Sequence, residues 1–376
     1  MVLMALDHVR HFFSDALGSK STELMQHNAP QFLTRWVTHF CAPAFIYLAG
    51  VAAFLSMAAK GRTVAELRGF LVKRGLVLIA LELTVVRCFG WTFNFDYHYA
   101  LGGVLWVLGW CMIVMAALVH LPKKALLVAG SVLMIAHNAF DRVHPKDVRP
   151  FGWLWKLVHS PGVIEPMHGF YFKVAYPLVP WIGLMMVGFA TGSIFLPGTS
   201  RRRTLVSIGV LLTLTFVVLR LLDGYGDPKP WSPQETPVAT ILSFVNCDKY
   251  PPSLLFLLMT MGPILCALGL YEALPAFLAG PFLVFGRVPL FYYLIHLPLI
   301  HGLAVVLSMV RYGGASWLFM NPPSAHGPSF PLPPDYGYSL PVLYALWIGV
   351  TVLLFPACRW YERKKRIFAA PWLKYI

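Results

Sequence analysis

Long apolar runs restrict this chain more than any other feature of its sequence. Ten of them can be traced, at residues 1–13, 36–57, 72–89, 100–119, 125–140, 176–196, 204–222, 252–270, 289–310 and 340–358. Most have the ~17–25 residues that a helix needs to cross ~30 Å of hydrocarbon. Charged residues make up only 12% of the chain, about half of the roughly 25% of a soluble domain. The sequence therefore predicts an all-α polytopic membrane protein of about ten transmembrane helices, with residues 1–376 forming a single domain.

The positive charge of the chain is placed unevenly, and this predicts the orientation. If the N-terminus is inside, the cytoplasmic segments hold 17 Lys and Arg against three acidic residues, and the outer half holds 13 against 12. Positive inner loops are typical of membrane proteins, so the net charge of +14 requires no nucleic-acid partner. Both termini are then cytoplasmic. The run at 277–286 predicts a half-helix before the ninth span, and the run at 1–13 is too short to cross, so we interpret the first helix as truncated.

The densest group of ionisable residues lies in the first run. Asp7 and His11 are four residues apart and share one helix face, and His8 follows Asp7 directly. Ionisable side chains at membrane depth are costly and are functional candidates by default. An aspartate that orients a histidine produces a general base, so Asp7, His8 and His11 are catalytic candidates. The alternative is an Asp7–Arg10 ion pair with both imidazoles at the water interface.

A second group lies in and just before the ninth run. Tyr292 and His296 are four residues apart on one helix face, near a break predicted at Pro298. His296 is the rival candidate for the base, because it lies deeper than the histidines of the first run. Arg287, at the inner end, could hold a phosphate. The alternative is that these side chains only pack between helices.

Two further groups at the outer ends of spans could bind the acceptor of a reaction. His137 and Asp141 share a helix face beside Asn138, and could bind a sugar hydroxyl or only cap a helix end. Arg35 and His39 share a face at the start of the second span. No nucleotide-binding, zincin or α/β-hydrolase motif occurs, and the six cysteines form no C-x-x-C pair. We therefore expect no metal.

Several stretches together resemble one family. They are residues 1–13, 34–43, 47–50, 103–110, 137–141, 176–183 and 287–301. This pattern is similar to the bacterial branch of the heparan-α-glucosaminide N-acetyltransferase family, within the transmembrane acyltransferases. The resemblance extends over nearly the whole chain. It implies transfer of an acetyl group from cytoplasmic acetyl-CoA to an amine or hydroxyl of an extracytoplasmic sugar, and a location in the bacterial cytoplasmic membrane among membrane lipids.

The residues supply parts that such an enzyme would need. The basic inner rim would attract the phosphates of acetyl-CoA, with Arg287, Arg68, Lys73 and Arg74 as candidates. Donors for the oxyanion could come from Arg10, Asn138 or Tyr292, and we allow for a homodimer. The main alternative is a secondary transporter or flippase of a glycan or lipid precursor. Transporters often show inverted repeats and paired broken helices, and the sequence contains one candidate break.

Overall fold

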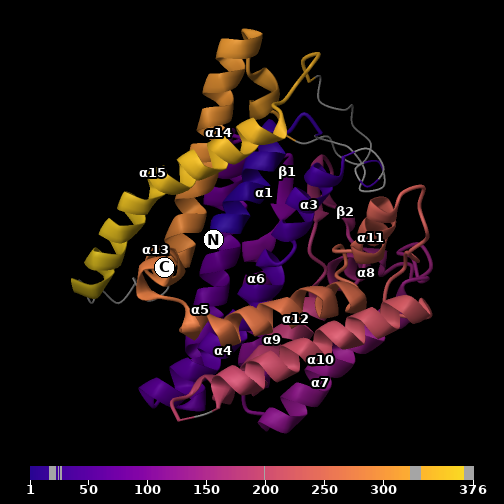
Figure 1. Ribbon diagram of the computed structural model, residues 1–376, viewed down its shortest axis with the longest axis vertical. Helices are drawn as coiled ribbons and strands as arrows, with labels where there is room; N and C mark the ends of the chain where they lie inside the picture. Colours follow the sequence, from indigo (N-terminus) through magenta and orange to yellow (C-terminus); the bar gives the residue numbers. More distant parts are fainter. Residues whose placement is uncertain (17–22, 24, 26–27, 199, 322–331, 368–376) are drawn as a thin grey trace.

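The computed structural model describes residues 1–16, 23, 25, 28–198, 200–321 and 332–367, and it is mostly helical (Figure 1). Among these residues, five helices are long and apolar enough to cross a membrane: Ala29–Ala59, Leu178–Phe195, Arg201–Leu222, Pro289–Tyr312 and Leu340–Ile367. Shorter apolar helices accompany them. The protein is therefore an integral membrane protein, as the sequence predicts.

Each predicted apolar run contains a helix. The main helices are α1 (Val2–Phe13), α3 (Ala29–Thr38), α4 (Cys41–Lys60), α5 (Val64–Leu81), the π-helix η1 (Glu82–Trp91), α6 (Val104–Leu118), α7 (Lys123–Ala136), α9 (Leu178–Thr191), α10 (Arg201–Leu222), α12 (Leu254–Leu270), α13 (Ala276–Arg287), α14 (Pro289–Tyr312) and α15 (Leu340–Ile367). Shorter elements are η2 (His137–Phe140), α8 (Gly152–Val158), η3 (Gly192–Phe195), α11 (Pro237–Val245), η4 (Tyr271–Ala273) and η5 (Ser316–Phe319). The predicted half-helix before the ninth span is confirmed as α13.

A small sheet in the loops is an element that the sequence pattern did not predict. It contains β1 (Tyr99–Gly102), β2 (Gly162–Met167) and β3 (Phe170–Val174) in the order β1-β3-β2. β2 and β3 form an antiparallel hairpin, and β1 pairs parallel to β3. The sheet joins the segment before α6 to the hairpin before α9, and so fixes where both helices begin.

Pairs of glycines bring the main helices into backbone contact. A Cβ on Gly75 of α5 would lie 2.6 Å from the carbonyl oxygen of Gly109 of α6, and the reverse distance is also 2.6 Å. Gly130 of α7 and Gly183 of α9 meet in the same reciprocal way, at 2.6 Å in each direction. Glycines also allow close backbone approach between α4 and α9, at Gly50 and Gly188, and between α10 and α12, at Gly209 and Gly262. Figure 1 shows α10 and α12 side by side across the lower part of the molecule. Because lipid tails provide no hydrophobic drive between helices, such close packing stabilises the bundle.

Glu82 is buried, and its carboxylate serves as the N-terminal cap of another helix. One oxygen accepts a hydrogen bond of 2.8 Å from the backbone N–H of Leu105, in the first turn of α6. The N-cap position of α6 is Gly103, where a Cβ would lie 2.5 Å from Glu82 Oε1. The N–H groups at a helix start carry partial positive charge, so the carboxylate and the helix end stabilise one another. This contact explains a charged residue in the middle of an apolar run.

Replacing Glu82 with alanine is therefore expected to destabilise the protein by about 1–3 kcal/mol, because a buried N–H loses its acceptor. Glu82→Gln, which keeps an acceptor oxygen, should cost less. The matched control is Glu66→Ala, since Glu66 forms a capping box with Thr63 at the exposed start of α5, where water can replace it. Thermal unfolding in detergent measures all three. Equal losses for Glu82→Ala and Glu66→Ala would contradict the buried cap.

Candidate active site

Two histidines from distant parts of the chain meet in the core of the bundle. His8 of α1 and His296 of α14 lie with Nδ1 of the first 2.7 Å from Nε2 of the second. Their rings are stacked at 4.8 Å between centroids, and both side chains are buried. Tyr293 packs edge-on against both rings. The sequence named these histidines as rival candidates, and the structure joins them in one hydrogen-bonded pair.

The backbone around His296 fixes the tautomers of the neutral pair. Nδ1 of His296 lies 2.9 Å from the carbonyl oxygen of Tyr292 and 2.8 Å from that of Tyr293. A carbonyl oxygen only accepts, so this nitrogen must carry the proton. Nε2 of His296 then accepts from Nδ1–H of His8. The lone pair that remains on Nε2 of His8 is therefore the basic nitrogen of the pair.

Asp7 lies next to His8 in the chain, but its hydrogen bonds go elsewhere. Among the described residues, its carboxylate accepts from Arg10 at 3.2 Å and from Thr38 at 3.1 Å. The structure therefore contains the Asp7–Arg10 pair that the sequence allowed as an alternative. The orientation of His8 comes from His296 instead. Thr38 links α3 to α1 through this carboxylate, whereas the contact with Arg10 stays within α1.

The other predicted catalytic residue, His11, lies at the exposed outer side of α1. Its ring packs edge-on against Trp91 at 5.1 Å. His301, one and a half turns along α14 from His296, is buried between the rings of Phe12 and Phe93. Its two ring nitrogens lie 2.9 Å from backbone carbonyl oxygens, so it holds loops to α14 rather than joining the His8–His296 pair.

A group of charged residues lies around Asp7. Lys249, in the loop before α12, interacts electrostatically with Asp7 and with Tyr250. Burial acts to lower the pKa of Lys249, but Tyr250 and Asp7 outweigh it and the pKa is raised overall. Lys249 therefore stays an ammonium ion beside the Asp7 carboxylate. Arg35 of α3 and His39, the residue that follows this helix, interact with the same group, so the structure brings these two predicted residues close to Asp7.

Of the predicted group His137, Asn138 and Asp141, the last two hold helix ends together, while the ring of His137 packs edge-on against His159. Asn138 accepts from the backbone N–H of Leu254, the first residue of α12, at 2.8 Å and donates to Asp141 at 2.8 Å. Burial raises the pKa of Asp141 and lowers the pKa of His159, which lies 3.6 Å away, so both favour their neutral forms. These contacts agree with the alternative that the group caps a helix end, because they hold the segment after α7 against the start of α12.

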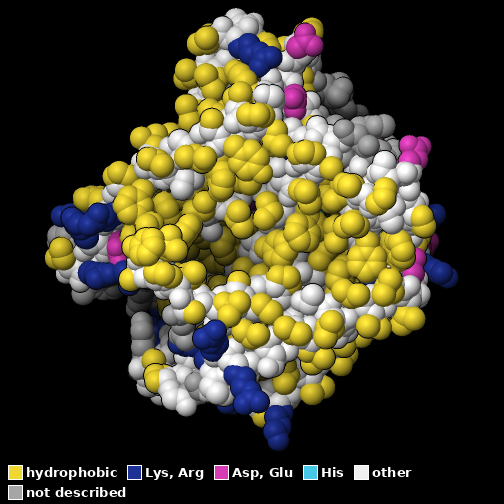
Figure 2. Space-filling view, in the orientation of Figure 1, with side chains coloured by type: hydrophobic (Ala, Val, Ile, Leu, Met, Phe, Trp, Pro, Cys, Tyr) yellow, Lys and Arg dark blue, Asp and Glu magenta, His cyan; other side chains and the backbone are white. Residues whose placement is uncertain are grey.

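A large cavity runs along α4 toward the histidine pair. Its volume is about 1350 Å³, and its lining includes residues of α4 from Ala44 to Ala59, about 22 Å at 1.5 Å per residue. At one end it is lined by Arg62 and Arg74, and at the other by Leu105 and Tyr293. The remaining lining is mostly apolar: Ala44, Phe45, Leu48, Ala49, Ala52, Ala53, Leu55, Leu71, Leu78, Val104, Leu108, Met112, Pro289 and Leu290. Figure 2 shows this face of the molecule hollowed beside α13, among hydrophobic side chains.

The basic residues that line the cavity differ from those that the sequence predicted to bind acetyl-CoA. Of the predicted residues, Arg74 lines the cavity, while Arg68 and Lys73 point from α5 to the exterior. Arg62 and Lys365 complete the lining and were missed. Phe70 lies under the guanidinium groups of Arg62 and Arg74, at 4.5 and 5.9 Å from its ring centroid. The sequence shows that the adjoining loops are positively charged, but it does not show which basic side chains point into the cavity.

Arg287 and Tyr292 are close to the cavity without lining it. Arg287 donates to Glu362 at 2.7 Å, and Glu362 also accepts from Arg366, so these residues join the C-terminal ends of α13 and α15. The ring of Tyr292 stacks on His296 at 5.1 Å. Its neighbour Tyr293 faces the cavity instead, and a sequence pattern cannot separate spacings of three and four residues without knowing where the cavity lies. Among the described residues, no group of three His, Cys, Asp or Glu could hold a metal ion.

These features define an integral membrane protein with an enzyme-like site, in which Tyr293 lies between a long cavity and a buried, hydrogen-bonded histidine pair. Residues 1–219 match the family model described as heparan-alpha-glucosaminide N-acetyltransferase, catalytic. The match covers more than half of the chain, so the chain belongs to this family, and the resemblance to the family is confirmed. This is a transferase family of membrane acetyltransferases acting on glycans. His8 lies within the matched residues and His296 beyond them. No curated protein matches the chain.

Proposed function

We propose that this protein transfers an acetyl group from cytoplasmic acetyl-CoA to an amine or hydroxyl of an extracytoplasmic glycan. One observation carries the proposal: a single cavity leads from basic residues to Tyr293, which packs against both His8 and His296. A donor with several phosphates and a long thin arm fits a cavity with a basic mouth and an apolar wall.

The basic mouth would hold the phosphates, and the alanine-rich wall of α4 would hold the pantetheine arm. Arg62, Arg74 and Lys365 supply the positive charge. The thioester would then lie beside Tyr293, at the end of the cavity opposite the basic mouth. The acceptor would enter on the outer side, where Asp7, Arg10, Lys249, Arg35 and His39 offer charged and polar contacts.

The chemical step requires a base and a fixed geometry. Nε2 of His8 takes the proton of the acceptor amine or hydroxyl, whose lone pair attacks the thioester carbonyl carbon. A new C–N or C–O bond forms and the C–S bond breaks. The coenzyme A thiolate then takes a proton from the imidazolium ion, which restores neutral His8. His296 is a positioning residue, because it holds the His8 ring in the required tautomer.

The membrane topology is part of this proposal. We propose ten membrane crossings by one domain, with both termini in the cytoplasm of a bacterial cell and the protein in its inner membrane. The positive residues of the inner loops and the basic mouth of the cavity support this orientation. The outer groups around Asp7 and Lys249 then face the acceptor.

Acetyl transfer by proteoliposomes tests the function directly. Acetyl-CoA supplied on the side of the basic loops, with glucosamine on the other, should produce N-acetylglucosamine and free coenzyme A thiol. Replacing Arg62 and Arg74 with glutamine should raise the KM for acetyl-CoA about tenfold, with a smaller effect at high salt, because contacts to charged phosphates are lost.

Arg68→Gln with Lys73→Gln is the matched control. It removes two positive charges from α5 that point away from the cavity, so KM should change little. An equal rise in KM for both double variants would show that surface charge in general attracts the donor. Absence of transfer from either side would contradict the proposed function itself.

A further inference from the structure

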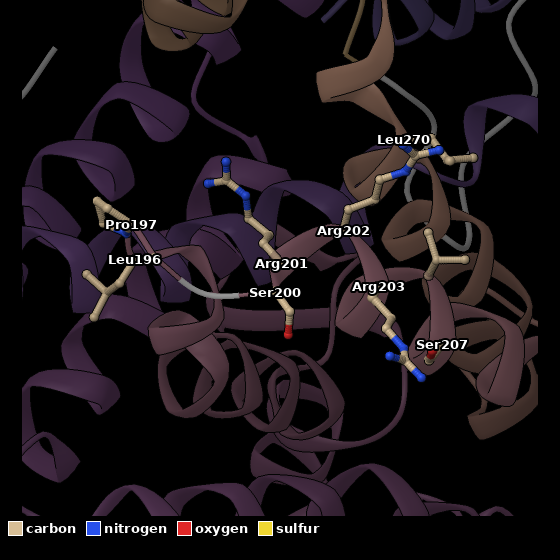
Figure 3. A pocket seen from close by; sticks show the side chains of 10 residues that line it. Leu196, Pro197, Ser200, Arg201, Arg202, Arg203, Ser207 and Leu270 are labelled. Atoms are coloured by element: carbon tan, nitrogen blue, oxygen red, sulfur yellow. The ribbon is translucent and has the colours of Figure 1, made fainter.

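A second cavity lies at the beginning of α10, apart from the first. Its volume is about 580 Å³, and Arg201, Arg202 and Arg203 line it together with Ser200 and Leu270. It shares no lining residue with the cavity along α4. Figure 3 shows the three arginine side chains leaving the first turn of α10 in different directions, with Arg202 extending toward Leu270 and Arg203 toward Ser207.

The charge here acts against the stability of the helix that carries it. The N-terminal end of a helix has a partial positive charge, which favours acidic residues and disfavours basic ones. The first turn of α10 has three arginines and no acidic residue, and the N-cap Ser200 makes no capping hydrogen bond with its side chain. A bound anion would reverse this repulsion. The cavity therefore favours a negatively charged ligand.

The rest of α10 indicates which anion. Beyond the arginines, three apolar side chains at successive turns of α10 are 46–58% exposed: Val210, Leu214 and Val218. In a membrane this stripe faces lipid tails. A ligand that fits both parts has a phosphate at one end and hydrocarbon chains at the other. A soluble phosphate would contact the arginines but not the apolar surface formed by Val210, Leu214 and Val218.

We propose that the cavity at the beginning of α10 binds the phosphate headgroup of an anionic phospholipid from the inner leaflet, with the acyl chains along the Val210–Val218 surface. Arg201, Arg202 and Arg203 supply the positive charge, and Ser200 and Ser207 offer hydroxyl donors. The site depends on the proposed orientation but not on acetyl transfer. It would fix the depth of α10, and through the glycine contacts that of α12.

Lipid binding to the purified full chain in detergent tests the site. Dioleoyl-phosphatidylglycerol and dioleoyl-phosphatidylcholine are titrated separately, and bound lipid is counted by native mass spectrometry. The wild type should bind the anionic lipid preferentially. The triple variant Arg201→Gln, Arg202→Gln and Arg203→Gln should bind phosphatidylglycerol about 10²-fold more weakly. Each basic residue near an anionic lipid contributes a factor of about five. If the triple variant does not fold, Arg203→Gln alone should weaken this binding about fivefold.

The matched control removes three other positive charges expected on the same side of the membrane: Lys124, Arg359 and Arg363, each replaced with glutamine. This variant should bind phosphatidylglycerol like the wild type. Equal loss in control and test variants, equal binding of both lipids, or unchanged binding after the arginines are replaced would overturn the site. Full competition by glycerol 3-phosphate at the concentration of the lipid would assign the cavity to a soluble phosphate instead.

Discussion

His8→Ala is expected to lower kcat for acetyl transfer by about 10²–10⁴-fold, while the protein still folds and binds acetyl-CoA. His8 carries the free basic nitrogen of the buried pair, because Nδ1 of His296 is held by two backbone carbonyl oxygens. His296→Ala should also lower kcat, because the backbone carbonyls of Tyr292 and Tyr293 then no longer fix the tautomer of His8. Binding of acetyl-CoA to both variants should remain close to that of the wild type.

A pH profile separates the base from a residue with a purely structural role. The rate of the wild type should rise with pH to a plateau, since the base acts in its unprotonated form. His296→Asn should shift this profile, because Nδ1 of His8 then meets an amide in place of the imidazole. His11→Ala is the control within α1, since His11 is exposed and belongs to no hydrogen-bonded pair with His296. Wild-type rates in His8→Ala would move the base away from this pair.

Ala52→Trp is expected to lower kcat/KM for acetyl-CoA by more than about 10²-fold. Ala52 belongs to the alanine-rich wall of α4 that faces the cavity, where its side chain is exposed to the open space. An indole ring there would occupy the path that we propose for the pantetheine arm. Because misplacing the reacting groups by about 1 Å can cost 10²-fold in rate, a blocked path should cost at least as much.

Two controls accompany Ala52→Trp: its own thermal unfolding temperature, and a tryptophan placed elsewhere on α4. Since the ring enters open space, the thermal unfolding temperature should hardly change, unlike the result of overpacking a closed core. Ala58→Trp places the same ring on an exposed position of α4 outside the cavity lining, and should leave kcat/KM unchanged. Similar losses in both variants would mean that the cavity is not the route of the donor.

The sequence predicted the helical class, and it placed neighbouring residues correctly on one helix. Apolar length and helical spacing are local properties, so α14 and the residues Tyr292 and His296 could be placed on one helix from the sequence. The contact between His8 and His296 could not be predicted, because 288 residues separate them and no local rule relates the two helices. For the same reason Asp7 was assigned to a neighbouring histidine, whereas Thr38 of α3 is one of its partners.

Which basic residues face the cavity also could not be predicted from the sequence. Arg68, Lys73 and Arg74 look equivalent in the sequence, yet only Arg74 faces the cavity, because successive residues of a helix point about 100° apart. Lys249 could have been noticed as a charge close to an apolar run. Its approach to Asp7 depends on how the loop before α12 folds over α1, which composition does not reveal.

The glycine pairs have a mechanical consequence. Helices that touch through their backbones cannot slide or rotate past one another without losing those contacts, and the pair Gly75–Gly109 holds two walls of the large cavity together. Alternating-access transport moves one half of a bundle against the other, which this construction resists. A transferase can keep its frame still, because two carbons and an oxygen change sides while coenzyme A and the glycan each remain in their own compartment. We therefore expect the membrane to stay impermeable to both large molecules throughout turnover.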